Sequence, residues 1–102
     1  MRISQDKIDR IKEEVLSVLF RNSPKALFTS EIAMHMARDE EFLKRLLIEM
    51  EKGNLIAGVK KNASGVIYLR RIRWRLTNNT FQAYQRVHDQ NLKYDEKDHT
   101  YI

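Results

Sequence analysis

The chain has 102 residues and a formal net charge of +5; 42% of its residues are hydrophobic and 32% are charged. This length and composition indicate one globular domain with a modest core. No cysteine is present, which excludes disulfide bonds, thiolate zinc sites and cysteine nucleophiles. No apolar run is long enough for a signal peptide or a membrane span, so a cytoplasmic protein is expected.

A first helix is predicted from about Ser4 to Phe20, because Ser4 is a favoured N-cap residue and apolar residues follow at helical spacing. The apolar stripe, expected to lie in the core, consists of Ile8, Ile11, Val15, Val18 and Leu19. Outside this stripe, the helix has further apolar surface from Ile3, Leu16 and Phe20. This additional surface makes the helix a candidate dimer interface. Asn22-Ser23-Pro24 is expected to end the helix.

Two short helices joined by a tight turn are predicted next. Thr29 is the expected N-cap of the first, whose apolar face carries Ile32, Ala33 and Met36. Asp39 is the expected N-cap of the second, whose apolar stripe consists of Leu43, Leu47 and Met50. Gly53-Asn54 ends this helix, because both residues tolerate the left-handed conformation. Helix, tight turn and helix at this spacing form the helix-turn-helix pattern.

A β-hairpin follows, with strands predicted from Leu55 to Lys61 and from Val66 to Leu76 around a turn-rich tip, Asn62-Ala63-Ser64-Gly65. Because side chains alternate along a strand, one face of the second strand is largely apolar and includes Tyr68 and Trp74, both expected in the core. The other face carries a row of three arginines: Arg71, Arg73 and Arg75.

The arginine row has two interpretations. Residues two apart in a strand are separated by about 6.6–6.8 Å, so three guanidinium groups in a row can bind successive phosphates. Alternatively, the row is a solvated face that protects an exposed strand edge from pairing with another chain. Residues 54–88 contain seven basic residues and no acidic residue, whereas residues 1–53 contain ten basic and ten acidic residues. This concentration of positive charge favours a polyanionic partner.

The stretch from Ala26 to Leu76 resembles the winged helix-turn-helix family of DNA-binding domains. The resemblance rests on Phe28-Thr29-Ser30-Glu31-Ile32-Ala33 at the start of the motif, on the helix exit Gly53-Asn54-Leu55-Ile56, and on Trp74-Arg75-Leu76-Thr77 after the hairpin. It covers roughly residues 5–90. The family often has glycine three residues after that threonine, where this chain has Thr80.

The resemblance implies an α+β fold with a three-helix core, a β-hairpin wing and an additional C-terminal helix. In it, Ala26-Leu27-Phe28 is the short strand that pairs with the wing. It also implies double-stranded DNA binding by a small transcriptional regulator, with the second helix of the motif as the recognition helix. The implied DNA-binding residues are Lys44, Arg45, Lys60, Lys61, Arg71, Arg73 and Arg75.

The recognition helix departs from the family pattern in two respects. Its leading end carries three carboxylates, which either stabilise the helix start by about 0.3–1 kcal/mol each or accept from a cytosine amino group; we favour the structural role. The three residues are Asp39, Glu40 and Glu41. Phe42 and Leu46 are apolar where a DNA reader is usually polar, so they belong either to the core or to a protein contact.

The last helix is expected after a cap at Thr77 or Asn78, with apolar residues at Phe81, Tyr84 and Val87. We place the domain at residues 1–90 and a polar C-terminal tail at residues 91–102, with fraying from Asp95 to His99. The first and last helices are expected to form a homodimer; the alternative is that they pack on each other within one monomer.

No motif for catalysis, a cofactor or a metal site is found, so an enzyme is not expected. Besides DNA binding, two functions stay open for a winged-helix domain of this charge. One is a protein-interaction module that uses Phe42, Leu46 and the acidic helix start. The other is RNA binding through the basic wing.

Overall fold

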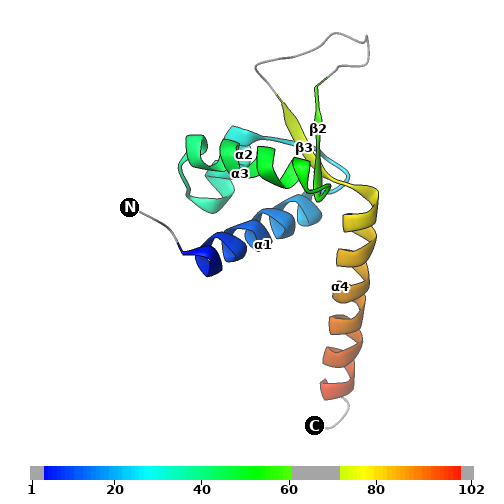
Figure 1. Cartoon of the computed structure of the whole chain (residues 1–102). Coiled ribbons are helices and arrows are strands. Elements are labelled where there is room, and N and C mark those ends of the chain that lie inside the picture. The colour runs from blue at the N-terminus through cyan, green and yellow to red at the C-terminus, as the bar shows by residue number, and fades with distance from the viewer. Residues whose placement is uncertain (1–3, 61–71, 100–102) are drawn as a thin grey trace.

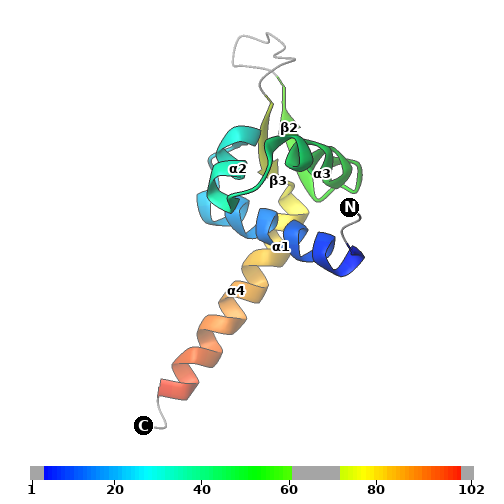
Figure 2. The ribbon, with the colours of Figure 1, turned by 90° about the vertical axis from the view of Figure 1, so that its left-hand side faces the viewer.

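The computed structural model describes the backbone of residues 4–60 and 72–99 and the side chains of these ranges up to residue 90. Its helices are α1 (Gln5–Asn22), α2 (Thr29–Met36), α3 (Glu40–Lys52) and α4 (Asn78–His99). Its strands are β1 (Leu27–Phe28), β2 (Ile56–Val59) and β3 (Arg73–Leu76). Figures 1 and 2 show α1, α2 and α3 packed together beside the sheet, whereas α4 extends away from this body. The predicted α+β architecture is confirmed.

The first helix begins as its sequence predicts and ends two residues later. The side chain of Ser4 accepts a hydrogen bond from the backbone N–H of Lys7 at 3.3 Å. At the other end, the Asn22 side chain donates to the carbonyl of Val18 at 2.8 Å. These bonds satisfy backbone groups that a helix end leaves without partners, so the polar residues Asn22 and Ser23 close the helix before Pro24.

The start of α2 differs from the prediction, because Thr29 is the first helical residue and Phe28 is the N-cap. The Thr29 hydroxyl accepts a hydrogen bond from the indole N–H of Trp74 at 2.9 Å instead of capping the helix. The Glu31 carboxylate accepts from the backbone N–H of Phe28 at 3.0 Å. Thr29 is therefore used to satisfy a buried indole, which no local sequence pattern indicates.

The turn between α2 and α3 is made by one residue in the left-handed conformation, Ala37, with φ 52° and ψ 46°. Asp39 then caps α3 as predicted, since its carboxylate accepts from the backbone N–H of Phe42 at 2.9 Å. At the end of α3 the left-handed residue is Asn54 with φ 61°, whereas Gly53 has φ −83°. Only one of the two residues predicted to permit this conformation adopts it.

Replacing Ala37 with glycine should raise the free energy of unfolding by about 0.5–1 kcal/mol. A left-handed residue with a Cβ costs about 1–2 kcal/mol, and glycine removes this cost while losing some chain entropy on folding. Urea unfolding measures the gain. Gln85→Gly, on the exposed surface of helix α4, is the control and should lower stability by about 0.5–1 kcal/mol. Equal losses from both substitutions would contradict the conformational argument.

The three strands form one antiparallel sheet in the order β1-β3-β2. Leu27 pairs with Trp74 in β1 and β3, and Gly58 pairs with Trp74 from the other side. The predicted pairing of the short strand with the wing is thus confirmed. The described strands of the hairpin are shorter than predicted, and the expected tip lies outside the described residues. Because β3 is the central strand, its arginines do not protect a sheet edge.

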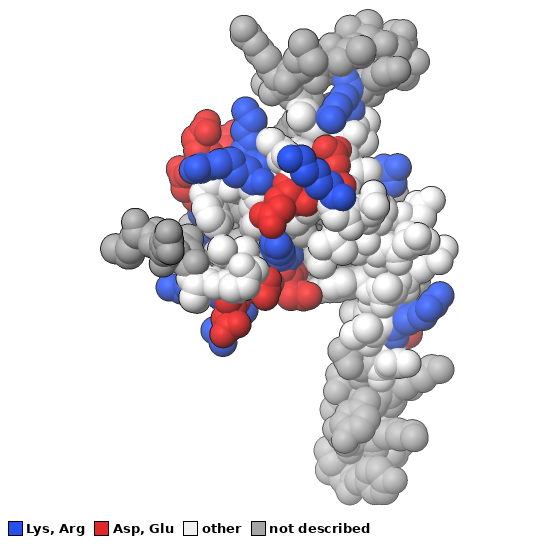
Figure 3. Space-filling model, in the orientation of Figure 1, with Lys and Arg blue, Asp and Glu red and all other residues white. Residues whose placement is uncertain are grey.

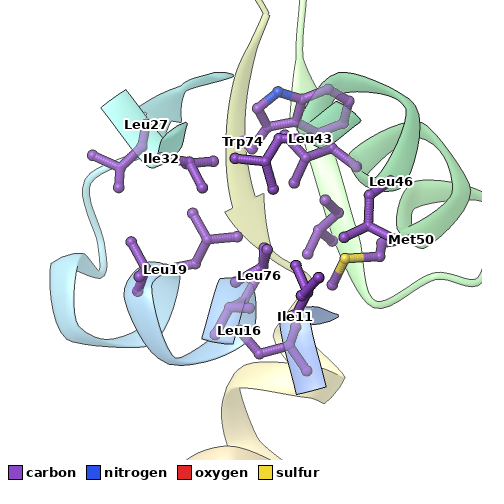
Figure 4. Close-up of a cluster of buried hydrophobic side chains, with 14 of the residues drawn as sticks. Ile11, Leu16, Leu19, Leu27, Ile32, Leu43, Leu46, Met50, Trp74 and Leu76 are labelled. Carbon is purple, nitrogen blue, oxygen red and sulfur yellow. The ribbon is translucent and has the colours of Figure 1, made fainter. Parts of the chain in front are cut away.

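The core lies between the sheet and the first three helices. Figure 4 shows Trp74 and Leu76 of β3 among side chains from α1, α2 and α3. Trp74 is 1% exposed, which confirms its predicted place in the core, and Leu46 is 5% exposed. Phe42 is half-buried against the same cluster. The core interpretation of Phe42 and Leu46 is therefore correct, and among the described residues no polar or charged side chain is buried.

The described side chains of the last helix pack against α1 from Phe81 to His88. Thr77 caps the last helix, since its hydroxyl accepts from the backbone N–H of Thr80 at 3.4 Å. The rings of Phe81 and Tyr84 then pack against Phe20 of α1, with centroids at 5.4 and 4.9 Å. Farther along, Val87 is 58% exposed.

The backbone of α4 stays helical through His99, so the expected fraying from Asp95 onward is wrong. The division of the chain at residue 90 stays a prediction. Within the described residues, no helix has the length and apolar character needed to cross a bilayer.

Candidate nucleic-acid interface

Helix α3 has one buried and one exposed face. The buried face carries Leu43, Leu46, Leu47 and Met50, so the residues between them are directed outward. Lys44 and Arg45 are exposed there, and neither forms an ion pair within the described part of the chain. Their charges are therefore available to an external anion.

The acidic leading end of α3 divides into two parts. The Asp39 carboxylate is occupied by its bond to the backbone of the first turn, which agrees with the structural role that the sequence favoured. Glu40 and Glu41 are exposed in the first turn, so they meet any ligand that approaches this end of the helix. In the face that Figure 3 shows, acidic and basic side chains alternate over the helices, without one continuous basic patch.

Glu51, near the end of α3, joins the helix to the wing. One of its carboxylate oxygens, Oε2, accepts from the backbone N–H of Gly58 in β2 at 2.9 Å. The other, Oε1, lies 3.6 Å from Nζ of Lys60. A Cβ on Gly58 would lie 2.8 Å from Glu51 Oε2 and 3.0 Å from the Ile72 side chain, so only glycine fits without a shift.

This connection was not predicted, because Glu51 looks like an ordinary solvated acid in the sequence and its partners come seven and nine residues later. It sets the direction of β2 relative to α3. Lys60, a predicted DNA-binding residue, is consequently held next to a carboxylate at the base of the wing. Lys61 and Arg71, predicted beside it, lie outside the described residues.

The remaining two predicted residues, Arg73 and Arg75, lie on the other face of the sheet. In β3 exposed and buried residues alternate, with Trp74 and Leu76 in the core. The two arginines between them are therefore directed away from the helices. The Arg73 guanidinium lies over the ring of Phe28, with Cζ 4.8 Å from the ring centroid. The Arg75 guanidinium donates to the carbonyl of Leu76 at 3.2 Å.

The described part of the predicted site thus falls into two surfaces. The first, here called the α3 surface, contains Lys44 and Arg45, with Lys60 attached through Glu51 at the start of the wing. The second, here called the outer sheet face, contains Arg73 and Arg75. Sequence reasoning placed all of them on one interface because it could not say on which side of the sheet the recognition helix packs.

Comparison with known proteins identifies the fold. Neither the protein-family models nor the curated proteins contain a match to the chain. Among solved structures, the complex of MepR from S. aureus with DNA is similar over 93% of this chain and 77% of that chain, with 19% identity and a TM-score of 0.64. The adhesin competence repressor AdcR from Streptococcus pyogenes is similar over 99% and 85%, with 13% identity and a TM-score of 0.57.

A structure of ZitR from Lactococcus lactis is similar over 87% of this chain, with 13% identity and a TM-score of 0.56, and this chain spans 60% of its length. At identities this low, the likeness concerns the backbone arrangement. In this arrangement the helix-turn-helix of α2 and α3 is followed by the strands of the wing and a C-terminal helix, as the sequence predicted. The chain has the winged helix-turn-helix fold.

Proposed function

We propose that this chain is a small cytoplasmic transcriptional regulator that binds double-stranded DNA through the α3 surface and the wing. The observation that carries the proposal is the pair of unpaired cations, Lys44 and Arg45, on the exposed face of α3. They occupy this position in a fold shared with MepR, whose structure was solved with DNA.

The chemistry of the α3 surface suits the major groove, which admits an α-helix. Arg and Lys side chains bind the O6 and N7 atoms of guanine or the phosphate oxygens. Lys60 stands at the base of the wing, and with Lys61 and Arg71 it supplies further phosphate contacts in this proposal. Arg73 and Arg75 also bind phosphates, from the outer sheet face.

The protein-interaction module loses its main support. It was the alternative to DNA binding because Phe42 and Leu46 are apolar on the expected recognition helix, and both side chains pack into the domain. RNA binding through the wing is separated from DNA binding by experiment. Duplex DNA and a structured RNA of equal length are titrated over a salt series. DNA binding should be tighter, with log Kobs falling by about 0.9 per phosphate contact per log unit of salt. Equal or tighter RNA binding, or no salt dependence, would contradict the proposal.

Replacing Glu40 and Glu41 together with glutamine should raise the affinity for all duplexes severalfold. Both carboxylates are exposed where α3 meets the DNA, so their removal reduces repulsion of the phosphates, while the cap at Asp39 keeps the helix start intact. Fluorescence anisotropy with a preferred and a random duplex measures the change. A loss confined to the preferred duplex would show that an acid reads cytosine. Asp6→Asn with Glu14→Gln, on exposed positions of α1, is the charge-matched control.

We also propose that the regulator is a homodimer that forms through α1 and α4. A groove of about 560 Å³ lies between these helices. Its lining includes Leu16, Phe20, Tyr84 and the exposed Val87. The contacts of Phe20 with Phe81, Tyr84 and His88 partly bear out the monomer alternative, but Val87 on the same apolar stripe stays 58% exposed. An apolar stripe of this kind is suited to burial against a second copy.

Val87→Glu should convert the dimer to a monomer and weaken DNA binding, because two linked half-sites are then lost. The substitution leaves the core of the monomer unchanged, since Val87 is already 58% exposed. Sedimentation at micromolar concentration measures the mass, and anisotropy measures the affinity. Gln82→Glu adds the same charge to α4 outside the groove and should keep the dimer. A wild-type monomer that binds DNA tightly would defeat the proposed dimer.

A further inference from the structure

The outer sheet face combines positive charge with a rigid support. Arg73 and Arg75 extend from β3, the central strand, which pairs with β2 along its length and with β1 at Arg73 and Trp74. Beside Arg73 is a shallow hollow of about 410 Å³, lined by Lys25, Ala26, Phe28, Glu31 and Arg73. Both arginines are exposed; Arg73 lies over the ring of Phe28 and Arg75 donates to the carbonyl of Leu76, and neither contact neutralises the guanidinium charge.

The charges on this face are not balanced. The one acid that lines the hollow is Glu31, and its carboxylate is already engaged: it accepts from the backbone N–H of Phe28 at 3.0 Å and lies 4.0 Å from Nζ of Lys25. Among the described residues, neither Arg73 nor Arg75 forms an ion pair. Two guanidinium charges therefore remain uncompensated on a surface where the third cation, Lys25, is only weakly paired.

The geometry favours phosphates as the ligand. The ring of Phe28 holds the Arg73 guanidinium at 4.8 Å, a cation–π contact that orders the side chain while leaving the edge of the guanidinium for hydrogen bonds. Arg75 follows two residues later, at about 6.6–6.8 Å along the strand. Ordered forks at a fixed spacing suit phosphate oxygens, and contacts of this kind require no base reading.

From these observations we infer that the outer sheet face binds the phosphate backbone of a second segment of duplex DNA while the α3 surface binds the first. The inference rests on the proposed function and extends it. Trp74 and Leu76 are directed toward the helices and the two arginines away from them. A straight duplex lying along α3 therefore faces the opposite side of β3 from Arg73 and Arg75, and the inference assigns these two arginines to a separate segment. The protein would then bridge two stretches of DNA.

The test counts duplexes per chain. A DNA hairpin of about 12 base pairs, slightly more than one helical turn, is added in excess, and native mass spectrometry gives the stoichiometry. The full-length wild type should bind two hairpins per chain. Arg73→Gln with Arg75→Gln should bind one, and Lys44→Gln with Arg45→Gln should also bind one. The four substitutions combined should bind none. Counting per chain makes the result independent of dimerisation.

The matched control is Lys7→Gln with Arg10→Gln, which removes the same charge from exposed positions of α1 and should leave two hairpins bound. A salt series adds a second readout. The double variant Lys44→Gln, Arg45→Gln should still bind one hairpin, with log Kobs falling by about 0.9 per phosphate contact per log unit of salt. Adding Arg73→Gln and Arg75→Gln to it should abolish this salt-dependent binding. Circular dichroism confirms that each variant is folded.

Each outcome separates the two proposals. One hairpin on the wild type, with no effect of the Arg73 and Arg75 substitutions, overturns the second surface and leaves the proposed function standing. One hairpin with a reduced salt slope in that variant means that both surfaces contact a single segment, which also overturns the inference. If the Lys7→Gln, Arg10→Gln control also lost one bound hairpin, the second hairpin would be held by net charge alone. Undiminished stoichiometry in the Lys44 and Arg45 variant would instead overturn the proposed α3 surface.

Discussion

Trp74→Ala should lower the free energy of unfolding by about 3–5 kcal/mol, the usual loss when a buried tryptophan is truncated. Trp74 is 1% exposed and lies between the sheet and the helices. A domain of this size has a total stability of about 5–15 kcal/mol, so the variant should be close to unfolded at ordinary temperature. Thermal unfolding followed by far-UV circular dichroism measures the loss. A melting temperature near that of the wild type would contradict the central place of this side chain.

Thr29 provides the matched test of the indole hydrogen bond. Thr29→Val preserves the shape but removes the acceptor of the Trp74 N–H. It should cost about 1–3 kcal/mol, because a donor is left unsatisfied next to the core. Thr29→Ser keeps the hydroxyl and should cost clearly less. If Thr29→Ser were the less stable of the two variants, packing of the threonine methyl, rather than the hydrogen bond, would account for this position.

Lys44→Ala with Arg45→Ala should produce the largest loss of DNA binding. Each good contact from Arg or Lys to a base edge is worth about 1–3 kcal/mol, or about 5- to 150-fold in affinity, and two contacts are removed together. The loss should be greater on a preferred duplex than on a random one, since only the former contains the matching bases. Both residues are exposed and unpaired within the described chain, so folding should be unaffected.

The control for this variant comes from the same helix. Lys52→Ala removes an exposed cation from the last turn of α3, outside the part of the helix that is proposed to enter the groove. It should change affinity only by the general electrostatic effect. The slope of log Kobs against log salt concentration should fall by about 0.9 or less. If Lys52→Ala weakened binding as much as the pair at the centre of the helix, the recognition role of Lys44 and Arg45 would be wrong.

The helices and their core faces could be predicted from the sequence because they depend on local periods. Ser4 and Asp39 were identified as caps since a cap and its partner are only three residues apart. Thr29 satisfied the same local rule and yet bonds to Trp74, 45 residues away. The buried indole has no other hydrogen-bond partner among the described residues, and this tertiary requirement prevails over the local preference.

The candidate site was predicted less completely than the fold. Alternation along the hairpin correctly placed Arg73 and Arg75 on one face, opposite Trp74. The same period carries no information about strand order, so it did not show that β3 is central or that its arginines face away from α3. Glu51 was missed for a similar reason: its partners are defined by how the wing folds back on the helix, which composition and spacing do not describe.

The hydrogen bond between Glu51 and Gly58 also has a consequence for the behaviour of the protein in concentrated solution. β2 is an edge strand of the described sheet, and the exposed N–H groups of an edge can recruit a strand from another molecule. The Glu51 carboxylate occupies one of these N–H groups and places a negative charge beside it. The carboxylate therefore works against strand addition at this edge, so one glutamate both ties β2 to α3 and opposes pairing of β2 with another molecule.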